Sequence, residues 1–171
     1  LIIVKYLGNS STVSVPNLIN EKIVKNIYSN CFINKDKIES ITIPNSVISI
    51  GSDAFSGCNG LTKVNITDLA AWFKITFDNE YANPLNYAHH LYLNNKELTE
   101  ITIPNSITKI NNYALCGASL IARVYIPSSV TTIAASSAYY SPFYGWNNSA
   151  VIFCEAESKS DAWEDFWNYN S

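Results

Sequence analysis

The feature that most constrains the fold of this chain is a phrase that occurs in it twice. Residues 38–64 read IESITIPNSVISIGSDAFSGCNGLTKV, and residues 98–124 read LTEITIPNSITKINNYALCGASLIARV. Both segments contain I-T-I-P-N-S, followed by apolar residues at matching offsets. A repeat this short cannot bury its own apolar face, so it must stack on a neighbouring copy. The sequence therefore predicts a solenoid.

Each repeat begins with a short strand. The same apolar spacing occurs at 38, 41 and 43, at 61, 64 and 66, at 98, 101 and 103, and at 121, 124 and 126. Alternation with period two, as at Ile41 and Ile43, is typical of a strand with one buried face. Pro44 follows at once and lacks the N–H that a ladder needs, so the strand ends there. Ala54 and Phe55 then predict a helical or 3₁₀ turn that fills the interior.

These offsets resemble the BspA-type leucine-rich repeat, whose pattern is close to L-x-x-I-x-I-P-x-x-V-x-x-I-G-x-x-A-F-x-x-C-x-x-L. The 38–61 unit matches it at Ile38, Ile41, Ile43, Pro44, Val47, Ile50, Gly51, Ala54, Phe55, Cys58 and Leu61. The 98–121 unit departs from it at Asn111, Leu115 and Ala118. The resemblance implies an α/β, β-dominated fold. The fold that it implies is a right-handed leucine-rich-repeat solenoid with a parallel sheet, short helical turns and a C-terminal cap.

We expect a single leucine-rich repeat domain over residues 1–171. Its repeats lie near 13–37, 38–60, 61–97, 98–120 and 121–150, and its cap is 151–171. The third repeat carries an insertion, because Leu98 follows Leu61 by 37 residues instead of 23. In this insertion Thr67 or Asp68 is expected to cap a short helix that bears Leu69, Trp72 and Phe73. Asn94-Asn95 predicts a hairpin turn.

The C-terminal segment departs from the repeat. Residues 151–158 read VIFCEAES and predict a last strand. Trp163, Phe166 and Trp167 follow at spacings of three and four, which indicates one face of a short helix. Because the end of a solenoid needs a cover for its core, we interpret this helix as the cap.

Composition excludes some function classes. The formal net charge is −3 and Arg123 is the only arginine, whereas a nucleic-acid-binding surface needs a basic patch. The longest apolar runs are far shorter than the ~20 residues that span a bilayer. The chain starts at Leu1 and not at methionine. We therefore expect a segment of a longer secreted bacterial protein, located outside the cell or on its surface.

The residues that often carry chemistry do not form a known site. The four cysteines lack a C-x-x-C pair, so we expect free thiols, with Cys31 and Cys58 buried. His89 and His90 are adjacent and would diverge, which disfavours a shared metal ion. The acidic residues of the C-terminal segment lack a calcium-loop pattern and fit a solvated face: Glu155, Glu157, Asp161, Glu164 and Asp165. We therefore predict no catalytic residue, no metal and no cofactor.

Aromatic residues crowd together at Tyr139, Tyr140, Phe143, Tyr144 and Trp146. One interpretation is a platform for sugar rings or a protein contact, because aromatic side chains bring large areas with few rotatable bonds. The other, which we favour, places Phe143 in the interior, at the position that Phe55 occupies in its own repeat, and packs the others around the cap.

Two functions follow. The resemblance implies a non-enzymatic surface module for adhesion or interaction with a host or microbial protein. The aromatic residues favour the alternative, a carbohydrate-binding accessory module of a polysaccharide-active surface protein. For the first, the outward strand positions should form one row of Ser40, Lys63, Glu100 and Arg123 and a second row of Thr42, Asn65, Thr102 and Tyr125. Strands lie about 4.8 Å apart, so Glu100 is expected between Lys63 and Arg123. The candidate partner-binding residues are Lys63, Glu100, Thr102, Arg123 and Tyr125.

Overall fold

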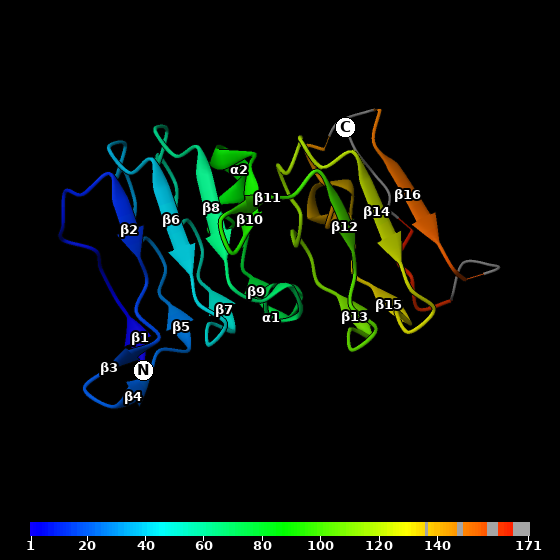
Figure 1. Cartoon of the computed structure of the whole chain (residues 1–171), viewed down its shortest axis with the longest axis horizontal. Helices are drawn as coiled ribbons and strands as arrows, with labels where there is room; N and C mark the ends of the chain where they lie inside the picture. The colour runs from blue at the N-terminus through cyan, green and yellow to red at the C-terminus, as the bar shows by residue number, and fades with distance from the viewer. Residues whose placement is uncertain (136, 147–148, 157–160, 166–171) are drawn as a thin grey trace.

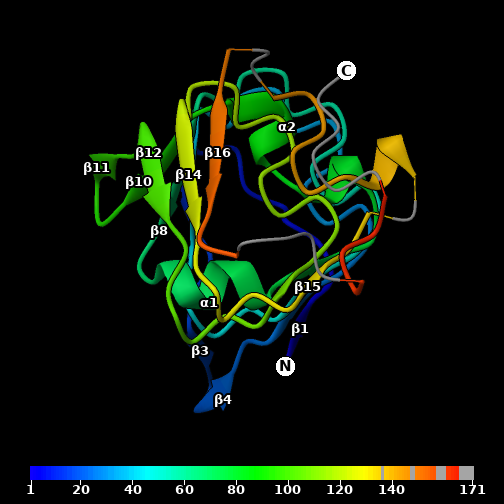
Figure 2. The ribbon, with the colours of Figure 1, turned by 90° about the vertical axis from the view of Figure 1, so that its right-hand side faces the viewer.

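The chain forms a solenoid of stacked coils. The computed structural model describes residues 1–135, 137–146, 149–156 and 161–165. The longer strands share one side and point the same way, while the chain advances along the solenoid axis and returns behind them (Figures 1 and 2). This makes the coil right-handed. The predicted fold class is confirmed, with parallel sheets and few helices.

The longer strands form two sheets on one side of the solenoid. The first, the long sheet, has the order β11-β10-β8-β6-β2, with β2 Thr12–Ser14, β6 Ser40–Ile43, β8 Lys63–Ile66, β10 Leu91–Leu93 and β11 Lys96–Glu97. The second, the C-terminal sheet, has the order β12-β14-β16, with β12 Glu100–Thr102, β14 Arg123–Ile126 and β16 Val151–Cys154. All neighbours pair in parallel except β10 and β11. The strands predicted from the repeat all form.

The shorter strands build a second wall below the first. One sheet has the order β1-β5-β7-β9, with β1 Ile2–Ile3, β5 Asn26–Ile27, β7 Ser49–Ile50 and β9 Thr76–Phe77. Another pairs β13 Lys109–Ile110 with β15 Thr132–Ile133. An antiparallel hairpin of β3 Leu18–Ile19 and β4 Lys22–Ile23 projects from the first coil. These walls close the interior on two sides.

The core is the row of repeat positions between the walls. Ile41 pairs with Val64 across β6 and β8, and both are fully buried. Phe32 and Phe55 stack from successive coils, with ring centroids 4.9 Å apart and an interplanar angle of 5°. Phe55 sits on a hydrogen-bonded turn, in which Cys58 N–H donates to the Phe55 carbonyl at 3.0 Å. The Phe55 ring of one coil is therefore packed on the Phe32 ring of the coil before it.

The insertion divides the solenoid. Helix α1 (Leu69–Lys74) begins at Asp68, whose carboxylate accepts from Ala71 N–H at 3.0 Å, and it buries Trp72 and Phe73. The 3₁₀ turn η1 (Glu80–Ala82) and helix α2 (Leu85–Ala88) follow. Among the described residues, no helix is both long and apolar enough to cross a membrane.

The predicted hairpin also forms at the end of the insertion. Asn94 and Asn95 adopt positive φ values of 51° and 66° between β10 and β11, as a tight hairpin turn requires. Both predictions for the insertion, the helix cap and the hairpin turn, are therefore confirmed, with Asp68 as the capping residue.

The C-terminal segment differs from the expectation in one respect. Strand β16 forms, but residues 161–165 are not helical. Trp163 instead forms a parallel bridge with Ile133 and donates its indole N–H to the Val130 carbonyl at 3.3 Å. Its ring is buried, so it covers the core as an extended residue. Phe166 and Trp167 lie outside the described residues, and the division of 1–171 into repeats and cap stays a prediction.

The cysteines behave as small apolar side chains. Cys31, Cys58 and Cys116 are buried, Cys154 is exposed, and all four are free thiols. Burial raises the pKa of Cys31 and Cys58 to about 11 and that of Cys116 to about 12, because a low dielectric disfavours the thiolate. The thiol of Cys58 donates to the Phe32 carbonyl at 3.1 Å.

We expect Phe55→Ala to lower the free energy of unfolding by about 3–5 kcal/mol, because it empties a fully buried site in contact with Phe32. Urea titration followed by circular dichroism measures this. Ile48→Ala is the matched control, since Ile48 belongs to the same coil but is half exposed, and should cost less than about 1 kcal/mol. Equal losses in the two variants would contradict this assignment of the core.

The thiols give a second test. With Ellman's reagent near neutral pH, we expect one rapidly reacting thiol in the folded protein, Cys154, and four after denaturation without reductant. The three buried thiols should not react in the folded protein, because they are inaccessible and because their raised pKa values leave almost no thiolate. A count below four in denaturant would reveal a disulfide.

Candidate interaction surface

The exposed face of the C-terminal sheet gathers most of the predicted site residues. Glu100 pairs with Arg123, and Thr102 pairs with Tyr125, on the adjacent strands β12 and β14. All four side chains are exposed, while Ile101 and Val124 between them are buried. Successive residues of a strand point to opposite faces, so these four share one side of the sheet.

Strand β16 completes this surface with two exposed apolar side chains. Val151 lies opposite Arg123, and Phe153 lies opposite Tyr125. The Tyr125 and Phe153 rings stack with centroids 4.8 Å apart and an interplanar angle of 9°. They are 36% and 44% exposed, so a large aromatic area stands on a rigid sheet. Together with Thr102, the pair forms a row across three strands.

An ion pair lies beside this row. The Arg123 guanidinium donates to the Glu100 carboxylate, and both side chains are about half exposed (49% and 48%). A pair this exposed contributes roughly 0–1 kcal/mol to stability. Its main effect is to hold two long side chains in place next to the aromatic pair.

Lys63 does not join this group. It lies on β8, whose next neighbour is β10, and β10 in turn pairs with the hairpin strand β11. The expectation that Glu100 lies between Lys63 and Arg123 is therefore wrong, because the insertion supplies a strand of its own after β8. Instead, the Lys63 ammonium lies 4.4 Å from the centre of the Tyr92 ring and donates to the Asn95 side chain at 3.4 Å.

Asn65 is also placed differently from the expectation. Its side chain accepts a hydrogen bond from Asn95 N–H at 2.8 Å, and it is 7% exposed. The turn of the hairpin covers it, so the second predicted row is interrupted at β8. The outward face of the solenoid is thus continuous only within each sheet.

Val151 and Phe153 were not among the predicted site residues. The repeat spacing of 23 residues would place the strand after β14 near 146–149, whereas the pairing of Arg123 with Val151 is 28 residues apart. The alternation in V-I-F-C was the available signal, since it matches R-V-Y-I of β14 in phase. Because the last coil is longer than the repeat, the repeat spacing did not align these two segments.

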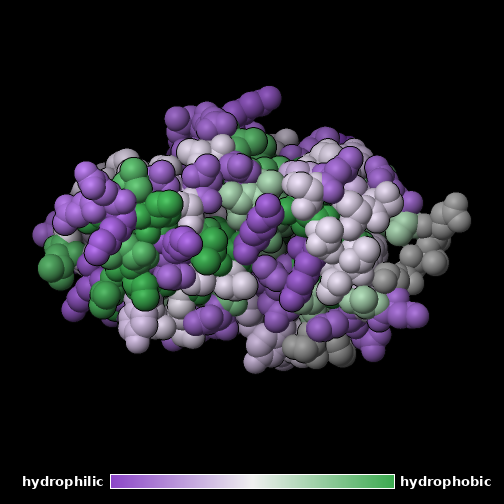
Figure 3. All heavy atoms as spheres, turned by 90° about the horizontal axis from the view of Figure 1, so that it is seen from below, coloured by the Kyte–Doolittle hydropathy of each residue, from purple (hydrophilic) through white to green (hydrophobic). Residues whose placement is uncertain are grey.

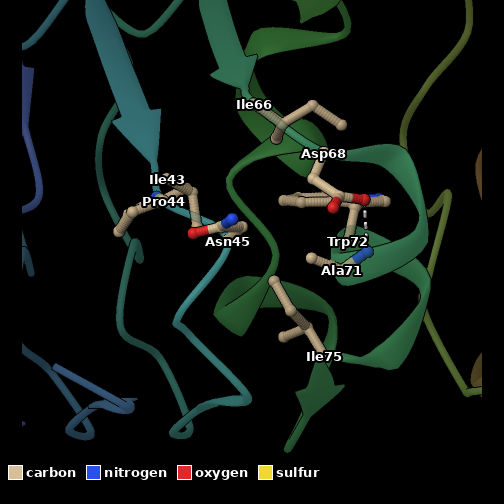
Figure 4. A pocket seen from close by; sticks show the side chains of 8 residues that line it. All are labelled: Ile43, Pro44, Asn45, Ile66, Asp68, Ala71, Trp72 and Ile75. Atoms are coloured by element: carbon tan, nitrogen blue, oxygen red, sulfur yellow. Dashed lines mark hydrogen bonds between the residues drawn. The ribbon is translucent and has the colours of Figure 1, made fainter. Parts of the chain in front are cut away.

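A depression at the end of β6 and β8 is not a ligand site. It is lined by Ile43, Pro44, Asn45, Ile66, Asp68, Ala71, Trp72 and Ile75, which Figure 4 shows around the start of α1. It has no room for a water molecule. Trp72 lines it, and the Trp72 indole N–H donates to the Ala114 carbonyl at 2.9 Å. The depression is a packing seam between the insertion and the repeat.

A hollow of about 340 Å³ opens at the N-terminal end. Its lining is mostly apolar and includes Ile3, Tyr6, Leu7, Val13 and Phe32. Apolar side chains spread over this end of the molecule in the view from below (Figure 3). Val13 and Phe32 belong to the interior row, so the hollow is the open end of the core.

The remaining candidate groups are engaged in structural contacts. The His89 ring nitrogen Nδ1 lies 2.7 Å from the Gly117 carbonyl, while His90 pairs with Glu97. Glu155 accepts from Ser128 N–H at 3.0 Å, and Glu164 accepts from Ala135 N–H at 2.6 Å.

No group of metal-ligating side chains is present among residues 1–135, 137–146, 149–156 and 161–165. Glu157, which we predicted to be solvated, lies outside them. Glu155 and Glu164 are exposed, as predicted, and each also accepts a hydrogen bond from a backbone N–H.

The chain is similar to known proteins in sequence and in structure. The family described as BspA type leucine-rich repeat region matches residues 25–144 in six copies. No curated protein matches the chain. A leucine-rich repeat protein of T. pallidum is 20% identical with a TM-score of 0.37, over 90% of this chain and 56% of that structure. The chain thus spans little more than half of that protein.

Two other bacterial structures are similar to the same degree. A leucine-rich repeat protein of Bacteroides capillosus is 19% identical with a TM-score of 0.37, over 91% of this chain and 86% of that one. A leucine-rich cell surface protein of Faecalibacterium prausnitzii is 15% identical with a TM-score of 0.37, over 95% of this chain and 73% of that one.

Proposed function

We propose that this chain, which belongs to the family of BspA-type leucine-rich repeat proteins, binds a protein partner through the exposed face of its C-terminal sheet. The observation that carries the proposal is the stacked and solvent-exposed pair of Tyr125 and Phe153. Large aromatic side chains provide much of the binding energy at protein interfaces. Here they stand beside Val151 and the Glu100–Arg123 pair, which add apolar area and charge.

The sheet suits this role because its side chains are ordered before a partner arrives. Tyr125 lies on the middle strand, between β12 and β16, and its ring is fixed against Phe153. A surface that loses little conformational freedom on binding retains more of its interaction energy as affinity. Thr102 and Glu100 would then form the polar rim of the contact.

The proposal includes a non-enzymatic role outside the cell. Family membership supports an interaction module, and the side chains of His89, Glu155 and Glu164 are engaged in structural hydrogen bonds. The partner would be a protein of a host or microbial surface.

The test uses surface plasmon resonance with immobilised fibronectin, laminin and collagen. We expect the wild-type chain to bind at least one of them and Tyr125→Ala/Phe153→Ala to weaken that affinity tenfold or more, about 1.4 kcal/mol. Thr12→Ala/Ser14→Ala is the control, because these exposed residues occupy the corresponding outward positions at the far edge of the long sheet. Circular dichroism confirms that both variants fold.

Two outcomes would contradict the proposal. One is a wild-type chain that binds none of the three proteins. The other is an affinity that the aromatic double variant leaves at the level of the control, which would show that the partner contacts another face.

A further inference from the structure

A second aromatic surface lies on the side of the solenoid away from the C-terminal sheet. It combines Tyr81 of η1 and Tyr87 of α2 with Tyr139 and Tyr144 from the turn η2 (Ala138–Tyr140) and the residues after it. We call these four residues the tyrosine platform. The yellow-orange turn η2 is on the side opposite β12, β14 and β16 (Figure 2). The two surfaces therefore cannot be covered by one contact.

The rings of the platform are close but not stacked flat. Tyr139 and Tyr144 have centroids 5.9 Å apart and an interplanar angle of 56°, and Tyr81 and Tyr87 have centroids 6.4 Å apart at 41°. Tyr139 is 69% exposed and Tyr81 is 39% exposed. Tilted, exposed rings leave part of their faces open. A side chain as exposed as Tyr139 contributes nothing to the core.

The two pairs belong to one patch with a shared carboxylate. Burial raises the pKa of the Tyr144 hydroxyl, and the charge of Glu80 raises it further. Gly117, whose N–H donates to the Tyr144 carbonyl, lies directly against the backbone of Asn86, the residue before Tyr87, and this joins the two pairs into one patch. Glu80 precedes Tyr81 on η1 and is half buried. The platform thus carries phenolic hydroxyls and, next to Tyr81 in the chain, the Glu80 carboxylate, which can accept hydrogen bonds.

The backbone beneath the platform is held firmly. Gly117 N–H donates to the Tyr144 carbonyl at 2.9 Å, and the ring of Phe143, the residue before Tyr144, is fully buried. On the other side, the Tyr87 hydroxyl accepts from Gly57 N–H at 2.9 Å. Asn79 caps η1 by accepting from Ala82 N–H at 2.9 Å. The exposed rings therefore stand on anchored turns.

We propose that the tyrosine platform binds a neutral saccharide. The C–H faces of a sugar ring pack against open aromatic faces, while its hydroxyls exchange hydrogen bonds with phenol and carboxylate groups. The platform offers both kinds of group, and its exposed members are all tyrosines. The Tyr125–Phe153 pair differs because its rings lie nearly parallel at 4.8 Å and cover each other's faces. The Glu80 carboxylate disfavours an acidic sugar by like-charge repulsion.

The test is isothermal titration of the full chain with cellohexaose, xylohexaose, mannohexaose and chitohexaose, and with sialyllactose as the acidic probe. We expect at least one neutral oligosaccharide to bind with a dissociation constant of about 1 mM. We expect no binding of sialyllactose. Tyr139→Ala should weaken that binding tenfold or more, whereas Tyr139→Phe keeps the ring and should retain most of it. Tyr28→Ala is the matched control, because Tyr28 is 56% exposed at the other end of the solenoid.

Further measurements separate this inference from the protein-binding proposal. Tyr125→Ala/Phe153→Ala should leave saccharide affinity unchanged, and Tyr139→Ala should leave binding to the matrix proteins unchanged. The inference is overturned if no neutral probe binds, if sialyllactose binds as well as they do, or if Tyr139→Ala behaves like Tyr28→Ala. Loss of matrix-protein binding in Tyr139→Ala, without sugar binding, would reassign the platform as a protein contact.

Discussion

The structure depends on the burial of one interior row of side chains between successive coils. Val13, Ile41 and Val64 lie in register on neighbouring strands and are buried, and Phe32 stacks on Phe55 beneath them. Full burial of such a side chain is worth roughly 1.5–3 kcal/mol, but only if the next coil is present. The strands, corners and turns of each coil are arranged around this requirement.

The insertion uses the same requirement in a different way. Helix α1 buries Trp72 and Phe73 where a further regular coil would have placed its own apolar residues. The hairpin β10–β11 then ends the long sheet and covers Asn65. As a result, the outward faces of the two sheets are separate surfaces. The exposed aromatic pair falls on the C-terminal one alone.

The repeat pattern was sufficient to predict the strands, because the period-two alternation at Ile41 and Ile43 and the terminating Pro44 are local signals. It also predicted Phe143 in the interior, where the structure buries it fully. The neighbours of Lys63 could not be predicted, since they depend on whether a strand inside the insertion pairs with β8. Trp163 was misassigned to a helix because its spacing from Phe166 and Trp167 fits helical periodicity, while its bridge to Ile133 is a long-range contact.

The break between the sheets has a mechanical consequence. Within each half, parallel ladders of main-chain hydrogen bonds join the coils. Across the boundary, the described contacts include hydrogen bonds from side-chain N–H groups to backbone carbonyls. They join Trp72 to Ala114, Asn83 to Tyr113 and Asn111 to Ile75. The stability of a solenoid is a sum of contributions from its coils and from the interfaces between them. The interface that lacks a ladder of main-chain hydrogen bonds is therefore the least stable one. Under tension along its axis, the protein would part there first, into an N-terminal piece that keeps the insertion and a C-terminal piece that keeps the aromatic sheet.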